Sequence, residues 1–227
     1  MKKEILEISN KKCTSYYAEN SEYLIIQPID DNDLSVLDSQ VALISQRVSS
    51  PFTLVGFMIS DWNAELSPWE APPVFGKVGF GCGAERTLSY IERELIPHLI
   101  ELYGFDENIP VILGGYSLAG FFSLWSSYKT DRFSAIMAAS PSVWFPNWID
   151  YAQNNVPRTK RIYLSLGDKE EKAKNKVMAT VGDSIREQYD LLCKCGIDCV
   201  LEWNEGNHFK DTGLRCANGF IWCLTNQ

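Results

Sequence analysis

Short apolar runs alternate with amphipathic runs along most of this chain, and that alternation is the feature that most limits its fold. Strand-like runs are expected at residues 22–30, 52–60, 110–117, 133–140, 161–171 (stopping at Gly167) and 198–209 (a strand plus a loop). Helix-like runs are expected at residues 34–46, 84–103, 118–128, 173–193 and 211–225. Strands that alternate with helices pair in parallel through helical crossovers. The sequence therefore predicts an α/β fold, with a mostly parallel central sheet and helices on both faces in three layers.

The length and charge of the chain narrow its class further. A chain of 227 residues has the length of one α/β domain, so we expect a single domain over residues 1–227. The formal net charge of −8 argues against nucleic acid and anionic membranes as partners, because both need clustered Lys and Arg. No apolar run is long enough to span a membrane, and the first residues lack the apolar run of a secretion signal. We therefore expect a cytoplasmic protein, and no oligomeric state follows.

The stretch GGYSLAG at residues 114–120 places a serine where an expected strand meets an expected helix. A nucleophile elbow needs this junction, because the backbone turns sharply at the nucleophile and strand and helix nearly touch around it. Gly115 before Ser117 and Ala119 after it are small enough for that contact, although the usual G-x-S-x-G motif has glycine in place of Ala119. The Leu118 amide at the helix start can donate to an oxyanion. The alternative is that Ser117 only caps the helix.

A serine hydroxyl needs a base, and the chain has 2 histidines. His98 lies inside the expected helix at 84–103, upstream of the serine, and we expect it to be structural or exposed. His208 lies in the polar loop NEGNHFKD, directly after the last expected strand. The chain order serine, acid, histidine is that of a doubly wound hydrolase, so we expect His208 to be the base.

A catalytic triad also needs an acid, and this acid should follow the strand that lies between the serine and the histidine in the sequence. The stretch LSLGDKEEK offers Asp168, Glu170 and Glu171, of which only one can orient the imidazole. Glu170 is three residues past Gly167, which gives the loop room to bring its carboxylate over the edge of the sheet. We therefore expect Glu170 to be the acid, with Asp168 and Glu171 as alternatives on a solvated, charged turn.

Four stretches together resemble the putative-esterase family of α/β-hydrolases, which includes enterochelin-esterase-like proteins, S-formylglutathione hydrolase and feruloyl esterases. They are ERELIPHLIELYG, VILGGYSLAGFFSLW, LSLGDKEE and EGNHF. The resemblance covers the chain from about residue 50 to its end. It implies an α/β-hydrolase fold in which Ser117 is the nucleophile, Glu170 the acid and His208 the base.

Two irregular segments border the expected site. In this fold a second oxyanion donor comes from the loop after the strand at 52–60. Ser60 and Asp61 supply the nearest amides there, and Asp61 is the working assignment within a 60–62 loop. Five aromatic residues in these segments either line an acyl or aryl pocket or seal the core, and we expect Trp62 and Trp144 to touch the substrate. The five are Trp62, Trp69, Trp144, Phe145 and Trp148.

Two further motifs carry no chemistry in this interpretation. Cys193, Cys195 and Cys199 are spaced by one and three residues, which is not the pattern of a zinc site, so we expect free thiols and no metal. The stretch GFGCG at 79–83 lacks both a preceding strand and the spacing of a dinucleotide-binding loop. We expect its glycines to give a bendable loop, and we expect no cofactor.

The sequence thus predicts a serine esterase that cleaves a small-molecule carboxylic ester through an acyl-enzyme. Two alternatives stay open. A thioesterase or acyltransferase would use the same triad, and a binding protein would keep the fold without activity. Because a fold does not fix a substrate, the ester itself is not predicted.

Overall fold

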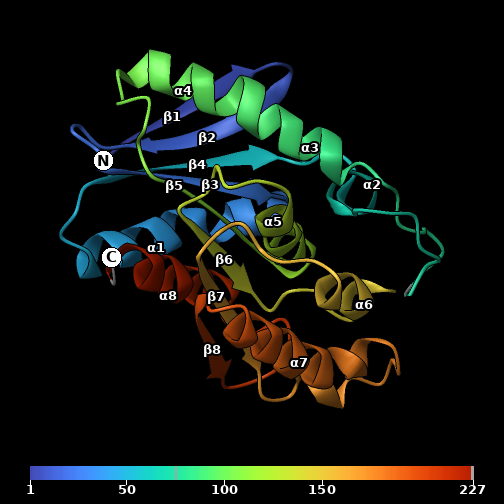
Figure 1. The fold of residues 1–227 in the computed structure, drawn as a ribbon. Coiled ribbons are helices and arrows are strands. Elements are labelled where there is room, and N and C mark those ends of the chain that lie inside the picture. The colour runs from blue at the N-terminus through green and yellow to red at the C-terminus, as the bar shows by residue number, and fades with distance from the viewer. Residues whose placement is uncertain (75, 226–227) are drawn as a thin grey trace.

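The computed structural model describes residues 1–74 and 76–225. One eight-stranded sheet runs through it in the order β1-β2-β4-β3-β5-β6-β7-β8 (Figure 1). Its strands are β1 (Lys2–Ile8), β2 (Lys11–Tyr17), β3 (Tyr23–Ile29), β4 (Phe52–Met58), β5 (Val111–Tyr116), β6 (Ala135–Ala139), β7 (Arg161–Gly167) and β8 (Asp198–Asn204). Strands β3 to β8 are parallel to one another, whereas β1 and β2 form a hairpin at one edge that pairs antiparallel with β4 through β2.

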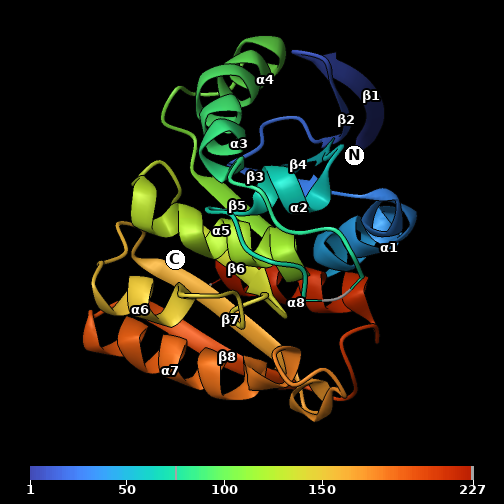
Figure 2. The same cartoon turned by 90° about the vertical axis from the view of Figure 1, so that its right-hand side faces the viewer.

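Helices cover both faces of the sheet, as the views in Figures 1 and 2 show. They are α1 (Asp31–Arg47), α2 (Trp62–Leu66), α3 (Ala84–Tyr90), α4 (Ile96–Tyr103), α5 (Ser117–Lys129), α6 (Trp148–Gln153), α7 (Val181–Lys194) and α8 (Thr212–Thr225). The apolar sides of α1 and α8 share one core cluster with the sheet, and those of α3 to α7 share the other. The predicted three layers around a mostly parallel sheet are confirmed.

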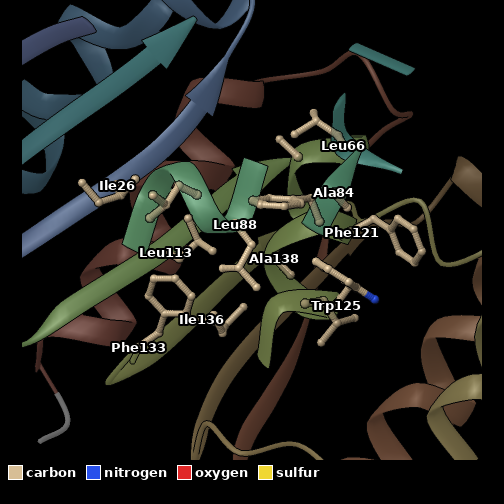
Figure 3. Packing of buried hydrophobic residues seen from close by; sticks show 14 of the residues in the cluster. Ile26, Leu66, Ala84, Leu88, Leu113, Phe121, Trp125, Phe133, Ile136 and Ala138 are labelled. Atoms are coloured by element: carbon tan, nitrogen blue, oxygen red, sulfur yellow. The ribbon is translucent and has the colours of Figure 1, made fainter. Parts of the chain in front are cut away.

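The central helix α5 is buried over nearly its whole length, because it packs against β5 and β6 in the middle of the sheet. Phe121 and Trp125 of α5 belong to the same buried cluster as Leu88 of α3 and Ile136 of β6 (Figure 3). A helix in this position is apolar on most of its surface. Its serines Ser123, Ser126 and Ser127 satisfy their buried hydroxyls by donating to carbonyls of the preceding turn.

The expected helix at 84–103 is continuous, but its middle turn, Ile91–Leu95, is a π-helix between α3 and α4. The Ile96 amide reaches back to the Ile91 carbonyl. Pro97, the next residue, has no amide proton and cannot donate an α-helical hydrogen bond. The series of backbone hydrogen bonds along the helix is therefore interrupted here in any case. The spacing of Leu88, Ile91, Leu95, Leu99 and Leu102 by three and four residues predicts one apolar face for this helix. Leu102 is 48% exposed, so that part of the prediction is wrong.

Two other expectations about elements are corrected, and one element was not expected. The expected helix at 173–193 begins only at Val181; residues 168–180 form a loop with two short 3₁₀ turns, Glu170–Lys172 and Met178–Thr180. The irregular segments expected at 61–83 and 141–151 contain the short helix α2 and the start of α6. The hairpin of β1 and β2 was not predicted.

The glycines at 79–83 serve close packing rather than a bendable loop. A Cβ on Gly81 would lie 2.8 Å from the Ala64 Cα, and one on Gly83 would lie 2.6 Å from the Ala64 carbonyl oxygen. The amides of both glycines donate to carbonyls of α2, those of Asn63 and Ala64. Glycine is needed because the two backbones touch.

Candidate active site

The chain turns from β5 into α5 at Ser117, whose φ is 57°. This left-handed backbone is costly for a residue with a side chain, and it points the hydroxyl out of the helix start. A Cβ on Gly115 would lie 2.6 Å from the Ala119 Cβ, and one on Gly120 would lie 2.8 Å from the Gly115 carbonyl oxygen. The small residues of GGYSLAG are therefore required by contact between strand and helix, and Ala119 fits where the usual motif has glycine.

His208 reaches Ser117 from the loop between β8 and α8. Its Nε2 lies 2.9 Å from the Ser117 Oγ. The loop is fixed from several sides, since the Tyr116 hydroxyl donates to the His208 carbonyl at 2.7 Å and the Asp168 carboxylate accepts the Gly206 amide at 2.7 Å. The imidazole is thereby placed over the serine by the backbone around it.

Glu170 lies on the far side of the imidazole, with its Oε2 2.7 Å from the His208 Nδ1. Its other oxygen, Oε1, accepts from the Ser140 hydroxyl at 2.7 Å, the Gly167 amide at 2.8 Å and Arg215 at 3.0 Å. Burial acts to raise the pKa of this carboxyl, but the hydrogen bonds and the charge of His208, with Ser140 and Gly167, outweigh it and lower the pKa. Glu170 is therefore held as a carboxylate.

The two alternative acids lie elsewhere. Asp168 is exposed and caps the turn to Gly206, and Glu171 pairs with Arg186 at 2.8 Å. Neither contacts His208. His98, the other histidine, is exposed on α4.

Sequence reasoning missed Arg215, which is 1% exposed although it is charged. Its Nη1 contacts the Tyr116 hydroxyl, the Ser140 hydroxyl and Glu170, and its Nη2 donates to the carbonyls of Glu205 and Asn207. It therefore joins the acid to the loop that carries His208. A signal was present: Arg215 is spaced by four residues from Gly219 and by eight from Cys223, both buried on α8. A charge on the buried face of a helix implies a buried partner.

The backbone amides around the serine only partly match the expected oxyanion donors. The Leu118 amide at the start of α5 has no acceptor among the described residues. The Asp61 amide, the working second donor, instead donates to Glu65 Oε1 at 2.9 Å, as does the Ser60 amide. Both are thus engaged by a carboxylate and are not free for a substrate. The next amide in the 60–62 loop, that of Trp62, has no acceptor within the described part of the chain.

A cavity of about 480 Å³ opens beside Ser117 and His208. Trp62, Trp144 and Phe80 form part of its wall, so the two tryptophans expected to touch substrate do face this space. The other three aromatics belong to the packing behind it: Phe145 and Trp148 are buried, and Trp69 packs edge-on against Phe145 and donates to the Pro146 carbonyl. The cavity wall is mainly apolar, which suits the body of a small organic ligand.

The described residues contain no group of three or more metal-ligating side chains. All seven cysteines are free thiols, and the sulfurs of Cys193 and Cys199 lie 3.5 Å apart. Over residues 1–74 and 76–225, no helix is both long and apolar enough to cross a membrane.

The chain matches a known protein family. The model of the family described as "Putative esterase" matches residues 33–191. No curated protein sequence matches the chain.

Several solved structures share the fold. An IroE-like serine hydrolase from Shewanella oneidensis has a TM-score of 0.79 at 16% identity, over 98% of this chain and 80% of that one. The siderophore hydrolase EstB from Aspergillus nidulans has a TM-score of 0.74 at 14% identity, over 98% and 94%. The enterobactin esterase FES from Shigella flexneri has a TM-score of 0.68 at 13% identity, over 98% and 58%.

Proposed function

The chain belongs to the putative esterase family and has the α/β-hydrolase fold, and from this premise we propose that Ser117, His208 and Glu170 are its catalytic triad. The chain is an esterase. The proposed reaction is hydrolysis of a carboxylic ester through an acyl-enzyme. The observation that carries the proposal is the hydrogen-bonded path from the Ser117 Oγ to the His208 Nε2 at 2.9 Å, and from the His208 Nδ1 to Glu170 at 2.7 Å.

Acylation begins when His208 takes the Ser117 proton as the serine oxygen attacks the ester carbonyl. An unassisted hydroxyl is a weak nucleophile, so the 2.9 Å contact with a base is what activates it. The Glu170 carboxylate accepts the hydrogen bond of the His208 Nδ1–H. This contact fixes the tautomer in which Nε2 is free to accept the proton. As a carboxylate it also stabilises the imidazolium that forms.

The carbonyl oxygen becomes negatively charged in the tetrahedral intermediate and needs donors. We assign the Leu118 amide and the Trp62 amide to this role. Both residues border the cavity beside Ser117, and both amides lack an acceptor among the described residues. Donors aimed at a developing charge contribute strongly in a water-poor site.

His208 then gives its proton to the leaving alcohol, and the acyl group stays on Ser117. Water attacks the acyl-enzyme with His208 again as base, which releases the acid and restores the serine. We infer that Arg215 acts as a positioning residue, because it holds Oε1 of Glu170 and thereby presents Oε2 to the imidazole. The single-domain organisation and the cytoplasmic location remain predictions.

Similar structures include proteins named as siderophore hydrolases and enterobactin esterases. Esters of that kind are candidate substrates for this chain. They are tested best after the serine itself has been shown to react.

The test is covalent labelling. Purified protein is treated with a fluorophosphonate and analysed by intact mass and peptide mapping, beside Ser117→Ala and His208→Ala. We expect one label per chain on Ser117, no label in Ser117→Ala and much slower labelling in His208→Ala. Folded protein that takes no label would contradict the triad, with circular dichroism as the control for folding.

A further inference from the structure

A second cavity of about 280 Å³ adjoins the first and is bounded by His208 but not by Ser117. The two spaces share His208, Trp144, Met178 and Phe209 in their walls, so they are contiguous. Phe209 is 83% exposed at their rim, although it is large and apolar. An exposed aromatic ring next to a catalytic group offers a contact surface for a ligand.

The loop between β7 and α7 brings positive charge to these cavities. It carries four lysines within residues 169–176. Lys169 and Lys172 border the smaller cavity, and Lys174 borders the larger one. The backbone ties this loop to the histidine loop, because the Lys169 amide donates to the Gly206 carbonyl at 3.1 Å.

These ammonium groups have no counter-ion among the residues that the structure describes. In the described part of the chain, Lys169, Lys172 and Lys174 form no ion pair, although nearby charges are paired as Glu171 with Arg186 and Glu205 with Lys210. The acidic residue in the smaller cavity, Glu170, is already held by Arg215 and His208. Asp168, next to Lys169, borders neither cavity. The site is therefore locally cationic in a chain whose net charge is −8.

The position of the triad decides which part of a substrate reaches the lysines. The acyl carbon must bond to Ser117, with its oxygen at the Leu118 amide, and both border the larger cavity. The alcohol must leave toward His208, which protonates it. The smaller cavity borders His208 without Ser117, so it is placed to receive the alcohol.

We propose that the natural substrate is an ester whose alcohol part carries a negatively charged group, a carboxylate or a phosphate, which binds Lys169 and Lys172 in the smaller cavity. This inference rests on the proposed esterase function and specifies its substrate class. In acylation the ester C–O bond breaks, the acyl carbon bonds to the Ser117 Oγ, and the alkoxide takes the proton that His208 removed from the serine. The charged group takes no part in the bond changes and contributes to binding.

The experiment compares esters that share one acyl group. Benzyl butyrate is the neutral reference, with 4-carboxybenzyl, 4-phosphonobenzyl and 4-trimethylammoniobenzyl butyrate as charged analogues. Monobenzyl succinate places the carboxylate on the acyl side instead. We expect kcat/KM to be about tenfold higher for the two anionic alcohols than for the neutral ester, through a lower KM, and to be lowest for the cation. The preference should decline as salt increases.

Matched variants separate this inference from the esterase activity. Lys169→Gln with Lys172→Gln should abolish the preference, so that kcat/KM for the anionic alcohols falls to the value for benzyl butyrate in the same variant. Lys176→Gln lies in the same loop but borders neither cavity, so it should keep the preference. The values of kcat/KM for the carboxybenzyl and phosphonobenzyl esters show which anionic group the site prefers. We expect the natural substrate to carry the preferred group.

Three outcomes overturn the inference in distinguishable ways. Turnover of the neutral ester with an equal or lower rate for both anionic alcohols removes the inference and leaves the esterase proposal standing. A preference only for monobenzyl succinate also contradicts it, because the charge would then bind on the acyl side. No turnover of any ester, together with no fluorophosphonate label on folded protein, removes the proposed function and the inference with it.

Discussion

The Nη1 of Arg215 and the Oε1 of Glu170 lie 3.0 Å apart, and the two residues are only 1% and 6% exposed. The same carboxylate meets His208 through its second oxygen, at 2.7 Å. One oxygen is therefore anchored to α8 and the other serves the imidazole. A buried pair of this kind is costly to break because the remaining charge has no partner.

Replacing Arg215 should impair catalysis through Glu170. We expect Arg215→Met to lower kcat by about 10- to 100-fold with a small change in KM, because the acid no longer presents a fixed oxygen to His208. Loss of the opposite charge also raises the pKa of Glu170, so the acid limb of the kcat profile should move to higher pH. The pH profile is the decisive measurement, since a purely structural loss would not shift it.

Arg215→Lys should retain the charge but lose the planar donor pattern, and its kcat should lie between wild type and Arg215→Met. Arg47→Met is the matched control, because Arg47 contacts α8 at Asn218 from the exposed end of α1. An unshifted pH profile in Arg215→Met would show that the arginine does not act through the acid.

The choice of acid can be tested with three isosteric amides. Glu170→Gln should lower kcat by about 10³- to 10⁴-fold, because the amide can favour the wrong imidazole tautomer. Asp168→Asn and Glu171→Gln should change kcat less than about threefold, because neither side chain contacts His208. Steady-state rates on one aryl ester compare the three. A larger loss in Asp168→Asn would transfer the role to Asp168.

Glu65 should help to orient the Trp62 amide, the second donor of the proposed oxyanion site. Its Oε1 accepts the amides of Ser60 and Asp61, which fixes the turn that leads to Trp62. We expect Glu65→Ala to lower kcat about tenfold, because the Trp62 amide loses its fixed direction. Lys11→Met removes the ion-pair partner of Glu65 but leaves both amide contacts, so its kcat should stay close to wild type. Equal kcat in both variants would contradict this role.

Asp33 should make the protein less stable as the pH rises. Burial and the charge of Asp30 raise the pKa of Asp33 from 3.8 to about 7. Between those pH values the folded chain binds more protons than the unfolded chain. The contribution of Asp33 to the free energy of unfolding is therefore greatest below about pH 4, decreases as the pH rises, and is lost above about pH 7.

Asp33→Asn keeps an acceptor for the Asp30 amide without the charge. We expect it to match wild type near pH 4 and to be more stable by on the order of 2 kcal/mol at pH 8. Thermal unfolding across pH measures this. Asp31→Asn, at an exposed position in the same turn of α1, is the matched control for an Asp-to-Asn change. A constant difference between Asp33→Asn and wild type at all pH values would refute the buried titration.

The parallel part of the fold was predictable because its strands are buried apolar runs, whereas the hairpin at the edge was not. Strand β1 is mostly exposed, and β2 buries the polar residues Thr14 and Ser15. Neither gives an apolar run. The start of α7 was misplaced for a related reason: Val177 has the helical spacing of Val181 and Ile185, but it is 44% exposed in the preceding loop.

At the candidate site, sequence reasoning selected Ser117, Glu170 and His208, which the structure brings into one hydrogen-bonded path. Motif and chain order contain that information, because they depend on local turns after parallel strands. The contacts of Arg215 and Glu65 could not be predicted, since they depend on how α8 and α2 pack against those turns. The same packing explains why the Asp61 amide is engaged.

The left-handed backbone at Ser117 places opposite demands on this residue, because thermal stability favours glycine and the proposed reaction needs serine. Glycine is the residue that adopts this conformation without cost, so Ser117→Gly should unfold at a higher temperature than Ser117→Ala, which keeps the strained geometry. The most heat-resistant residue at this turn is therefore one that lacks the proposed nucleophilic hydroxyl. Selection of sequences for stability alone would therefore replace the proposed nucleophile first.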